Sequence, residues 1–397
     1  MDEGDRERIL DSFERDRAAL LAAARAREAG LPARWLHQPS HFTVPASDSD
    51  RIRKAAGGLA PCRRLLERLG LAPAEVAAAL EVEQALLDEA LAGGAPPPVV
   101  IVDGEDATAL DPAVQARARA AAVEALCEVD WGRTLALYMP SGLELDACAR
   151  DLVDVVGATL CRGGRLDGVV WPKARHEDEL RLLDRTLAAL ESAPGQVRVV
   201  LMVESAAALA RLPALTEALR PRLGALVLGL VDLASDLGLP EARQDHPALD
   251  AARVQLVQAA AAVGVPAIDA MTFDYPVRDP ALDDAANRAR ALAALATCAR
   301  DARRGAALGM AGKWVGHPLQ LLVNEVVRRA ALGGPARVER DLAEARAYAD
   351  AVRAGRGAVA WQGRMLDRAT DRHVRVRLRA ALAYGLVAPD VAAALEL

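Results

Sequence analysis

The sequence has few cysteines, few aromatic residues and no long uncharged apolar run. Its five cysteines lie far apart and form no CxxC pair, which argues against a disulfide framework or a zinc site. No apolar stretch reaches the length of about 18 residues that a membrane-spanning helix needs. The amino-terminal segment MDEGDRERIL is too charged for a secretory leader. We therefore expect a soluble, cytoplasmic protein with reduced thiols and no membrane partner.

An excess of basic residues is also missing. The formal net charge of the 397-residue chain is −6, which argues against a nucleic-acid partner. Hydrophobic residues make up 52% of the chain while aromatic residues make up only 3%, so alanine supplies much of the apolar content. A chain of this length can bury a large core.

Short apolar runs alternate with amphipathic helical patterns along most of the chain. This alternation is typical of a parallel sheet covered by helices. Eight such runs match a (β/α)8 barrel in number, and the competing doubly wound sheet should carry a GxGxxG turn after an early strand, which is missing. The predicted strands lie in residues 41–46, 99–106, 134–139, 168–173, 197–205, 225–234, 266–271 and 306–318.

The predicted fold class is therefore α/β: a (β/α)8 TIM barrel with an N-terminal helix and a C-terminal helical extension. Residues 5–30 form one charged helical pattern that ends at Gly30. We expect an N-terminal helical segment over residues 1–35, the barrel over 36–325, and the extension over 326–397.

Polar residues follow most of the predicted strands, at the end of a barrel where chemistry is carried out. Carboxylates there would repel one another, and a hard divalent cation such as Mg²⁺ or Mn²⁺ would remove that repulsion. Each residue also has a simpler interpretation: a lone Asp as a helix N-cap, Lys173 as an ion pair, His317 as a buried turn residue. These polar residues are Asp103, Glu105, Asp106, Lys173, Glu204, Asp232, Asp269, Lys313 and His317.

Several segments in the same order resemble one known family. The similarity runs from about His41 to Asp367 and rests on VVIVDGEDAT, GVVWPKA, MVES, LGLVDLASDLG, PAIDAM, GKWVGHPLQLLVNEV and GRMLD. Together they resemble the HpcH/HpaI aldolase/citrate lyase superfamily, in particular its citrate lyase β-subunit-like and malyl-CoA lyase branch.

The resemblance implies a Mg²⁺-dependent carbon–carbon lyase or aldolase that acts on a 3-hydroxyacyl-CoA or a related hydroxy acid. It implies Glu204 and Asp232 as metal ligands, and Glu105 and Asp106 as residues that position the metal's waters. It further implies an electrostatic role for Lys173. Asp367 is the implied acid/base, which in this branch often belongs to a neighbouring subunit. A homotrimer or hexamer and a 2-oxo acid or acyl thioester substrate are expected.

The sequence departs from this family at the third strand, which reads TLALYMPSG and lacks the V-R-x-N motif. Tyr138 or a neighbouring apolar residue occupies the position of the family's arginine. We expect Tyr138, Asp269 and His317 to contact the substrate. Two alternatives remain open: a divergent aldolase for a free or carrier-bound acid without CoA, and a non-catalytic metabolite-binding or scaffold protein.

Overall fold

The computed structural model describes residues 3–27, 31–93, 98–106 and 108–397. Eight parallel strands form a closed barrel in which each strand pairs with the next and β8 pairs with β1. The predicted (β/α)8 fold is therefore confirmed. The strands are β1 (Ser40–Pro45), β2 (Val99–Asp103), β3 (Leu135–Met139), β4 (Gly168–Trp171), β5 (Arg198–Val203), β6 (Leu223–Leu228), β7 (Ala267–Asp269) and β8 (Gly312–Val315).

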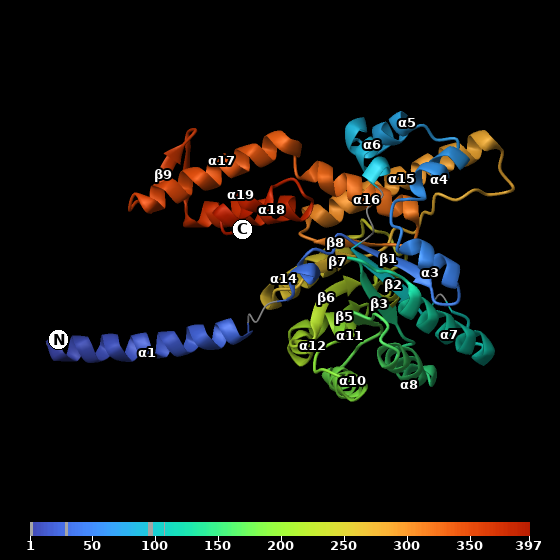
Figure 1. The fold of residues 1–397 in the computed structure, drawn as a ribbon, viewed down its shortest axis with the longest axis horizontal. Coiled ribbons are helices and arrows are strands. Elements are labelled where there is room, and N and C mark those ends of the chain that lie inside the picture. Colours follow the sequence, from blue (N-terminus) through green and yellow to red (C-terminus); the bar gives the residue numbers. More distant parts are fainter. Residues whose placement is uncertain (1–2, 28–30, 94–97, 107) are drawn as a thin grey trace.

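Helices surround the barrel on its outside (Figure 1). The chain up to the end of the barrel contains α1 (Glu3–Arg27), α2 (Ala33–Leu36), α3 (Ser49–Ala55), α4 (Cys62–Arg68), α5 (Pro73–Ala79), α6 (Gln84–Gly93), α7 (Pro112–Glu128), α8 (Ala147–Asp151), the π-helix η1 (Leu152–Gly157), α9 (Ala158–Cys161), α10 (Glu177–Leu190), α11 (Ala206–Ala210), α12 (Leu212–Leu219), α13 (Leu230–Asp236), α14 (Pro247–Val263), α15 (Asp284–Ala307) and α16 (Pro318–Ala331). The predicted helix end at Gly30 lies outside the described residues.

Two of the apolar runs that predict strands also include part of a neighbouring helix. The run over residues 225–234 divides into β6 and α13, with Gly229 between them. The run over residues 306–318 begins in the last turn of α15, and only Gly312–Val315 form β8. Asp232 consequently lies in the first turn of a helix rather than at the end of a strand.

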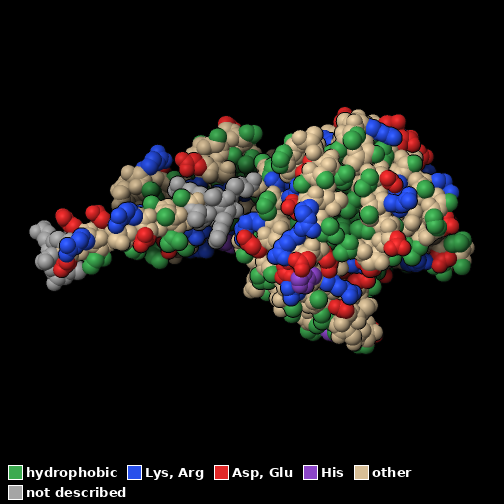
Figure 2. Space-filling view, turned by 90° about the horizontal axis from the view of Figure 1, so that it is seen from below, with side chains coloured by type: hydrophobic (Ala, Val, Ile, Leu, Met, Phe, Trp, Pro, Cys, Tyr) green, Lys and Arg blue, Asp and Glu red, His purple; other side chains and the backbone are tan. Residues whose placement is uncertain are grey.

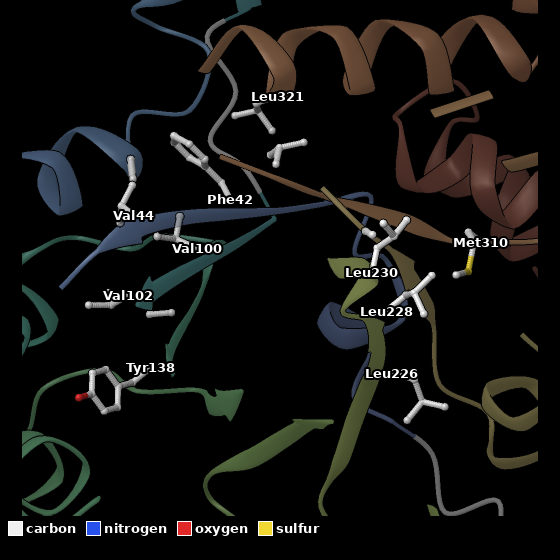
Figure 3. Close-up of a cluster of buried hydrophobic side chains, with 14 of the residues drawn as sticks. Phe42, Val44, Val100, Val102, Tyr138, Leu226, Leu228, Leu230, Met310 and Leu321 are labelled. Carbon is white, nitrogen blue, oxygen red and sulfur yellow. The ribbon is translucent and has the colours of Figure 1, made fainter. Parts of the chain in front are cut away.

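The side chains of the strands alternate between two buried layers. The inner layer fills the barrel and includes Ile101, Met139, Met202 and Trp314, while Trp35 from α2 closes the amino end of the barrel. The outer layer packs under the helices and is partly shown in Figure 3. Since both faces of every strand are buried, the strands read as continuous apolar runs in the sequence.

The remaining elements are α17 (Gly334–Arg353), β9 (Ala358–Trp361), β10 (Arg364–Asp367), α18 (Arg368–Ala383) and α19 (Pro389–Ala394). They share a small hydrophobic core of their own. The ring of Tyr384 lies 4.8 Å from that of His37, which precedes β1. This C-terminal region therefore lies beside the amino end of the barrel (Figure 1), and the division of the chain at residues 36 and 326 stays a prediction.

Candidate active site

The segments that follow β2, β4 and β5 meet around Lys173, which lies two residues after β4 at the carboxyl end of the barrel. Its ammonium group donates hydrogen bonds to the carboxylate of Glu105, in the turn after β2, and at 3.3 Å to Asp106. Burial tends to lower the pKa of Lys173, but the hydrogen bond and the negative charges of Glu105 and Asp106 outweigh it and raise this pKa. Lys173 therefore stays charged and counters two of the acidic groups.

The backbone of Lys173 makes a second connection. Its φ angle is +52°, in the left-handed region that residues other than glycine rarely adopt. In this conformation its N–H donates a hydrogen bond of 2.5 Å to Oε1 of Glu204. One residue thus links the acidic groups that follow β2 and β5, and an unfavourable backbone angle at this position is typical of functional sites.

Glu204 follows β5 directly and is 6% exposed. Burial raises the pKa of its carboxyl group to about 8, and the charges of Asp232 and Glu105 add to this rise while the hydrogen bond from Lys173 opposes it. A buried carboxyl group with this pKa needs a proton or a cation beside it near neutral pH.

Gly229, between β6 and α13, makes room for that carboxyl group. A Cβ atom at this position would lie 2.5 Å from both Cβ and Oε2 of Glu204. The backbone of Gly229 therefore forms one wall of the space around Glu204, and any side chain there would displace the carboxylate.

Asp232 lies in the first turn of α13, is exposed, and raises the pKa of Glu204 by its charge. Over the described residues, no group of three or more His, Cys, Asp and Glu side chains is placed to hold a metal ion. Magnesium commonly takes only one or two protein carboxylates and keeps several waters. The buried Glu204 and the exposed Asp232 fit that kind of site in their oxygen chemistry.

Tyr138 and Asp269 both point away from the barrel interior. Tyr138 lies in the outer layer (Figure 3), and a Cβ atom on Gly104 would lie 2.5 Å from its hydroxyl oxygen. Asp269 accepts a 2.7 Å hydrogen bond from Nε of Arg253 on α14, and both side chains are 1% exposed. Neither residue is part of the site that we propose below.

His317 caps α16, where its Nδ1 accepts a 3.2 Å hydrogen bond from the N–H of Leu319. Burial lowers the pKa of His317 to about 4, so its ring is neutral near pH 7. Lys313 is fully buried and donates a 2.6 Å hydrogen bond to the carbonyl of Ala270. Both residues therefore have structural partners at the β8 corner of the barrel.

Asp367, the implied acid/base, ends β10 and caps α18 by accepting hydrogen bonds from the N–H groups of Ala369 and Thr370. The hydrogen bonds from Thr370 lower the pKa of Asp367. It belongs to the C-terminal region beside the amino end of the barrel, whereas Lys173 and Glu204 lie at the carboxyl end (Figure 1). Within one chain these residues do not meet.

Two features of the site escaped the sequence analysis. Gly229 was not predicted as part of the site, although a glycine between an apolar strand and a helix can be seen in the sequence. Met139, in the inner layer at the end of β3, occupies the inward position nearest to the missing arginine. The sequence could not reveal this, because Tyr138 and Met139 are both apolar enough for either layer.

The fold and the site define a class: a (β/α)8-barrel protein with clustered carboxylates and one lysine at the carboxyl ends of its strands. None of the described helices is long and apolar enough to cross a membrane. Residues 83–318 match the family model HpcH/HpaI aldolase/citrate lyase. The chain belongs to this family, as the sequence motifs had indicated.

The chain is similar to several known proteins. An L-malyl-CoA/beta-methylmalyl-CoA lyase of Cereibacter sphaeroides is 31% identical over 307 residues, which cover 71% of this chain and 87% of that protein. The enzyme of the same name from Rhodobacter capsulatus is 29% identical over the same length. A citrate lyase from Burkholderia xenovorans has the same fold, with a TM-score of 0.59, 23% identity and coverage of 79% of this chain and 91% of that chain.

Proposed function

We propose that this protein is a Mg²⁺-dependent carbon–carbon lyase that cleaves or forms a 3-hydroxyacyl-CoA of the malyl-CoA type. The observation that carries the proposal is the cluster in which Lys173 joins Glu105, Asp106 and the buried Glu204. The relatives named L-malyl-CoA/beta-methylmalyl-CoA lyase, at about 30% identity, support the substrate class.

In this proposal Glu204 and Asp232 hold the metal ion, and Glu105 and Asp106 orient its water ligands. A protein of this fold, CitE from Mycobacterium tuberculosis, was crystallised with magnesium, acetoacetate and coenzyme A. Bound Mg²⁺ would act as a Lewis acid on the carbonyl group of a 2-oxo acid. Gly229 keeps space open for the carboxylate of Glu204, and Lys173 holds that carboxylate through its backbone N–H.

A carboxylate is also needed to remove or return the proton on the carbon next to the thioester. We propose Asp367 of a neighbouring copy for this role, in a homotrimer or hexamer. Apolar side chains are exposed on the loops and the helix start around the carboxyl end of the barrel, and others are exposed on the C-terminal region that carries Asp367, which supports such a contact. The first set is Leu110, Leu143, Val231, Phe273 and Val277, and the second is Val352, Met365 and Val376.

A second candidate function is aldol chemistry on an acid without CoA. Met139 favours it, because a thioether at the inward end of β3 offers no positive charge to a substrate carboxylate or an enolate. Turnover of malyl-CoA and of free hydroxy acids, measured side by side with Mg²⁺ and with EDTA, separates the two functions. Turnover that is unaffected by EDTA, or no turnover in a broad aldol screen, would refute the lyase proposal.

Complementation tests the role of Asp367. We expect Glu204→Gln and Asp367→Asn each to abolish activity when produced alone. When the two variants are produced together, about a quarter of the active sites should be functional, because half of the barrels keep Glu204 and half of the donated side chains keep Asp367. Asp390→Asn, on α19 of the same region, is the matched control and should stay active. No recovery in verified mixed oligomers would contradict an Asp367 supplied by a neighbour.

A further inference from the structure

Helix α1 extends from the body of the protein as a separate rod in Figure 1, and Figure 2 shows acidic and basic side chains along the elongated end of the molecule. Its 25 residues correspond to a length of about 37 Å. The described side chains from residue 7 to residue 22 are all exposed. A lone helix of this kind is only marginally stable in water, and most helices are stabilised by packing an apolar face.

An apolar stripe runs along this helix. Five large apolar side chains are 45% to 72% exposed. At 100° per residue they fall within about 120° of the helix circumference. They are Ile9, Leu10, Phe13, Leu20 and Leu21. The ion pairs on α1 are exposed contacts within single turns, between Arg8 and Asp5 and between Arg17 and Glu14, and such pairs contribute little.

Charges are distributed unevenly along the same helix. In the sequence, residues 3–16 contain six acidic and three basic residues, a balance of −3. Residues 17–27 contain three arginines and no acidic residue, a balance of +3. A second copy in antiparallel orientation would bring the acidic part of each helix against the basic part of the other, whereas a parallel copy would bring like charges together.

We propose that α1 is an association helix that pairs in antiparallel orientation with α1 of a second copy of this chain. A two-fold axis near residue 15 places Leu10 opposite Leu20 and Ile9 opposite Leu21. It also places Phe13 opposite Arg17, which suits contact between an aromatic ring and a guanidinium group. One self-complementary face thus covers the whole stripe, as a two-fold interface requires.

The mass of the full-length protein in solution tests this pairing. We expect Phe13→Glu combined with Leu20→Glu to halve the mass measured by light scattering, because in this proposal the α1 pair is the contact that joins the two halves of the assembly. The matched control is Ala18→Glu with Ala22→Glu, which places the same charges on the opposite face of α1 and should leave the mass unchanged. Equal masses for the wild type and the Phe13/Leu20 variant would overturn the proposal.

Disulfide trapping tests the orientation. In a Cys161→Ser background, which removes the exposed native thiol, Leu10→Cys and Leu20→Cys chains are mixed and oxidised. Antiparallel pairing predicts cross-links between the two different chains and few within either chain alone. Cross-linking of Leu10→Cys chains with one another would indicate a parallel pair, and absence of any cross-link would indicate that the helices do not meet; either result overturns the proposal.

Discussion

Replacing Glu204 with glutamine should change stability in opposite directions with and without a divalent cation. The carboxyl group is buried, and burial raises its pKa from 4.5 to about 8. Below pH 4.5 both the folded and the unfolded chain carry the proton. Between pH 4.5 and about 8 the unfolded chain loses it first, so the free energy of unfolding falls as the pH rises. Above pH 8 the metal-free protein carries the full penalty of a buried charge.

The size of this penalty follows from the shift in pKa. A rise from 4.5 to about 8, at about 1.4 kcal/mol per pH unit, gives an upper limit of about 5 kcal/mol. Because water entry and small movements relieve part of it, we expect Glu204→Gln to stabilise the metal-free protein by about 1–3 kcal/mol at pH 8.5 and by almost nothing at pH 5. A cation on the carboxylate reverses the sign, since it stabilises only the wild type.

Urea denaturation at fixed protein concentration measures both effects, in EDTA and in millimolar Mg²⁺. The matched control is Glu325→Gln on α16, a glutamate whose pKa burial also raises but which pairs with Arg329. This control should keep the full response to Mg²⁺. Equal stabilisation of wild type and Glu204→Gln by Mg²⁺, or a destabilised Glu204→Gln in EDTA at pH 8.5, would refute the reasoning.

Three further changes test two residues of the site, Lys173 and Gly229, and one residue outside it, Asp269. Lys173→Met should reduce kcat at least tenfold while Mg²⁺ still binds in calorimetry, because it removes the ammonium group but leaves the N–H bonded to Glu204; unchanged kcat would count against Lys173. Gly229→Ala should lower the free energy of unfolding by about 1–3 kcal/mol and abolish the stabilisation by Mg²⁺, since its Cβ would lie 2.5 Å from Glu204. A Mg²⁺ titration that matches that of the wild type would contradict this. Asp269→Asn should lower the free energy of unfolding by about 3 kcal/mol with unchanged KM, because it breaks the buried pair with Arg253; a raised KM in folded protein would instead support substrate contact.

The barrel could be predicted from the sequence because its strands are buried on both faces. Each strand appears as a short apolar run, and in the helices between them the apolar residues recur with a period of about 3.6 residues. The end of β6 could not be predicted from the run ALVLGLVDLA, because the strand and the first turn of α13 are equally apolar. Only Gly229 marks the boundary, and its importance comes from contact with Glu204, 25 positions away in the sequence.

The same burial explains why part of the site could not be predicted. In a strand that is apolar on both faces, the period of two that separates inward from outward side chains is invisible. The side chain of Asp269 points outward to its partner Arg253 on α14. The side chain of Tyr138 points outward, with its hydroxyl group in the space that the missing Cβ atom of Gly104 leaves free. Lys173 and Glu204 could be predicted because they follow their strands, where a charged residue after an apolar run is conspicuous.

The charges at the carboxyl end of the barrel indicate the order in which Mg²⁺ and the substrate acid bind. Glu105, Asp106, Glu204 and Asp232 supply four carboxyl groups, and Lys173 is the basic group that contacts them in the described part of the chain. A carboxylate substrate would add another negative charge near groups whose charges already add to the burial-raised pKa values of Glu105 and Glu204. Because Met139 adds no positive charge at the end of β3, the acid has little to attract it until a cation is bound. We therefore expect Mg²⁺ to bind before the acid, and calorimetry of the acid without Mg²⁺ should give no heat of binding.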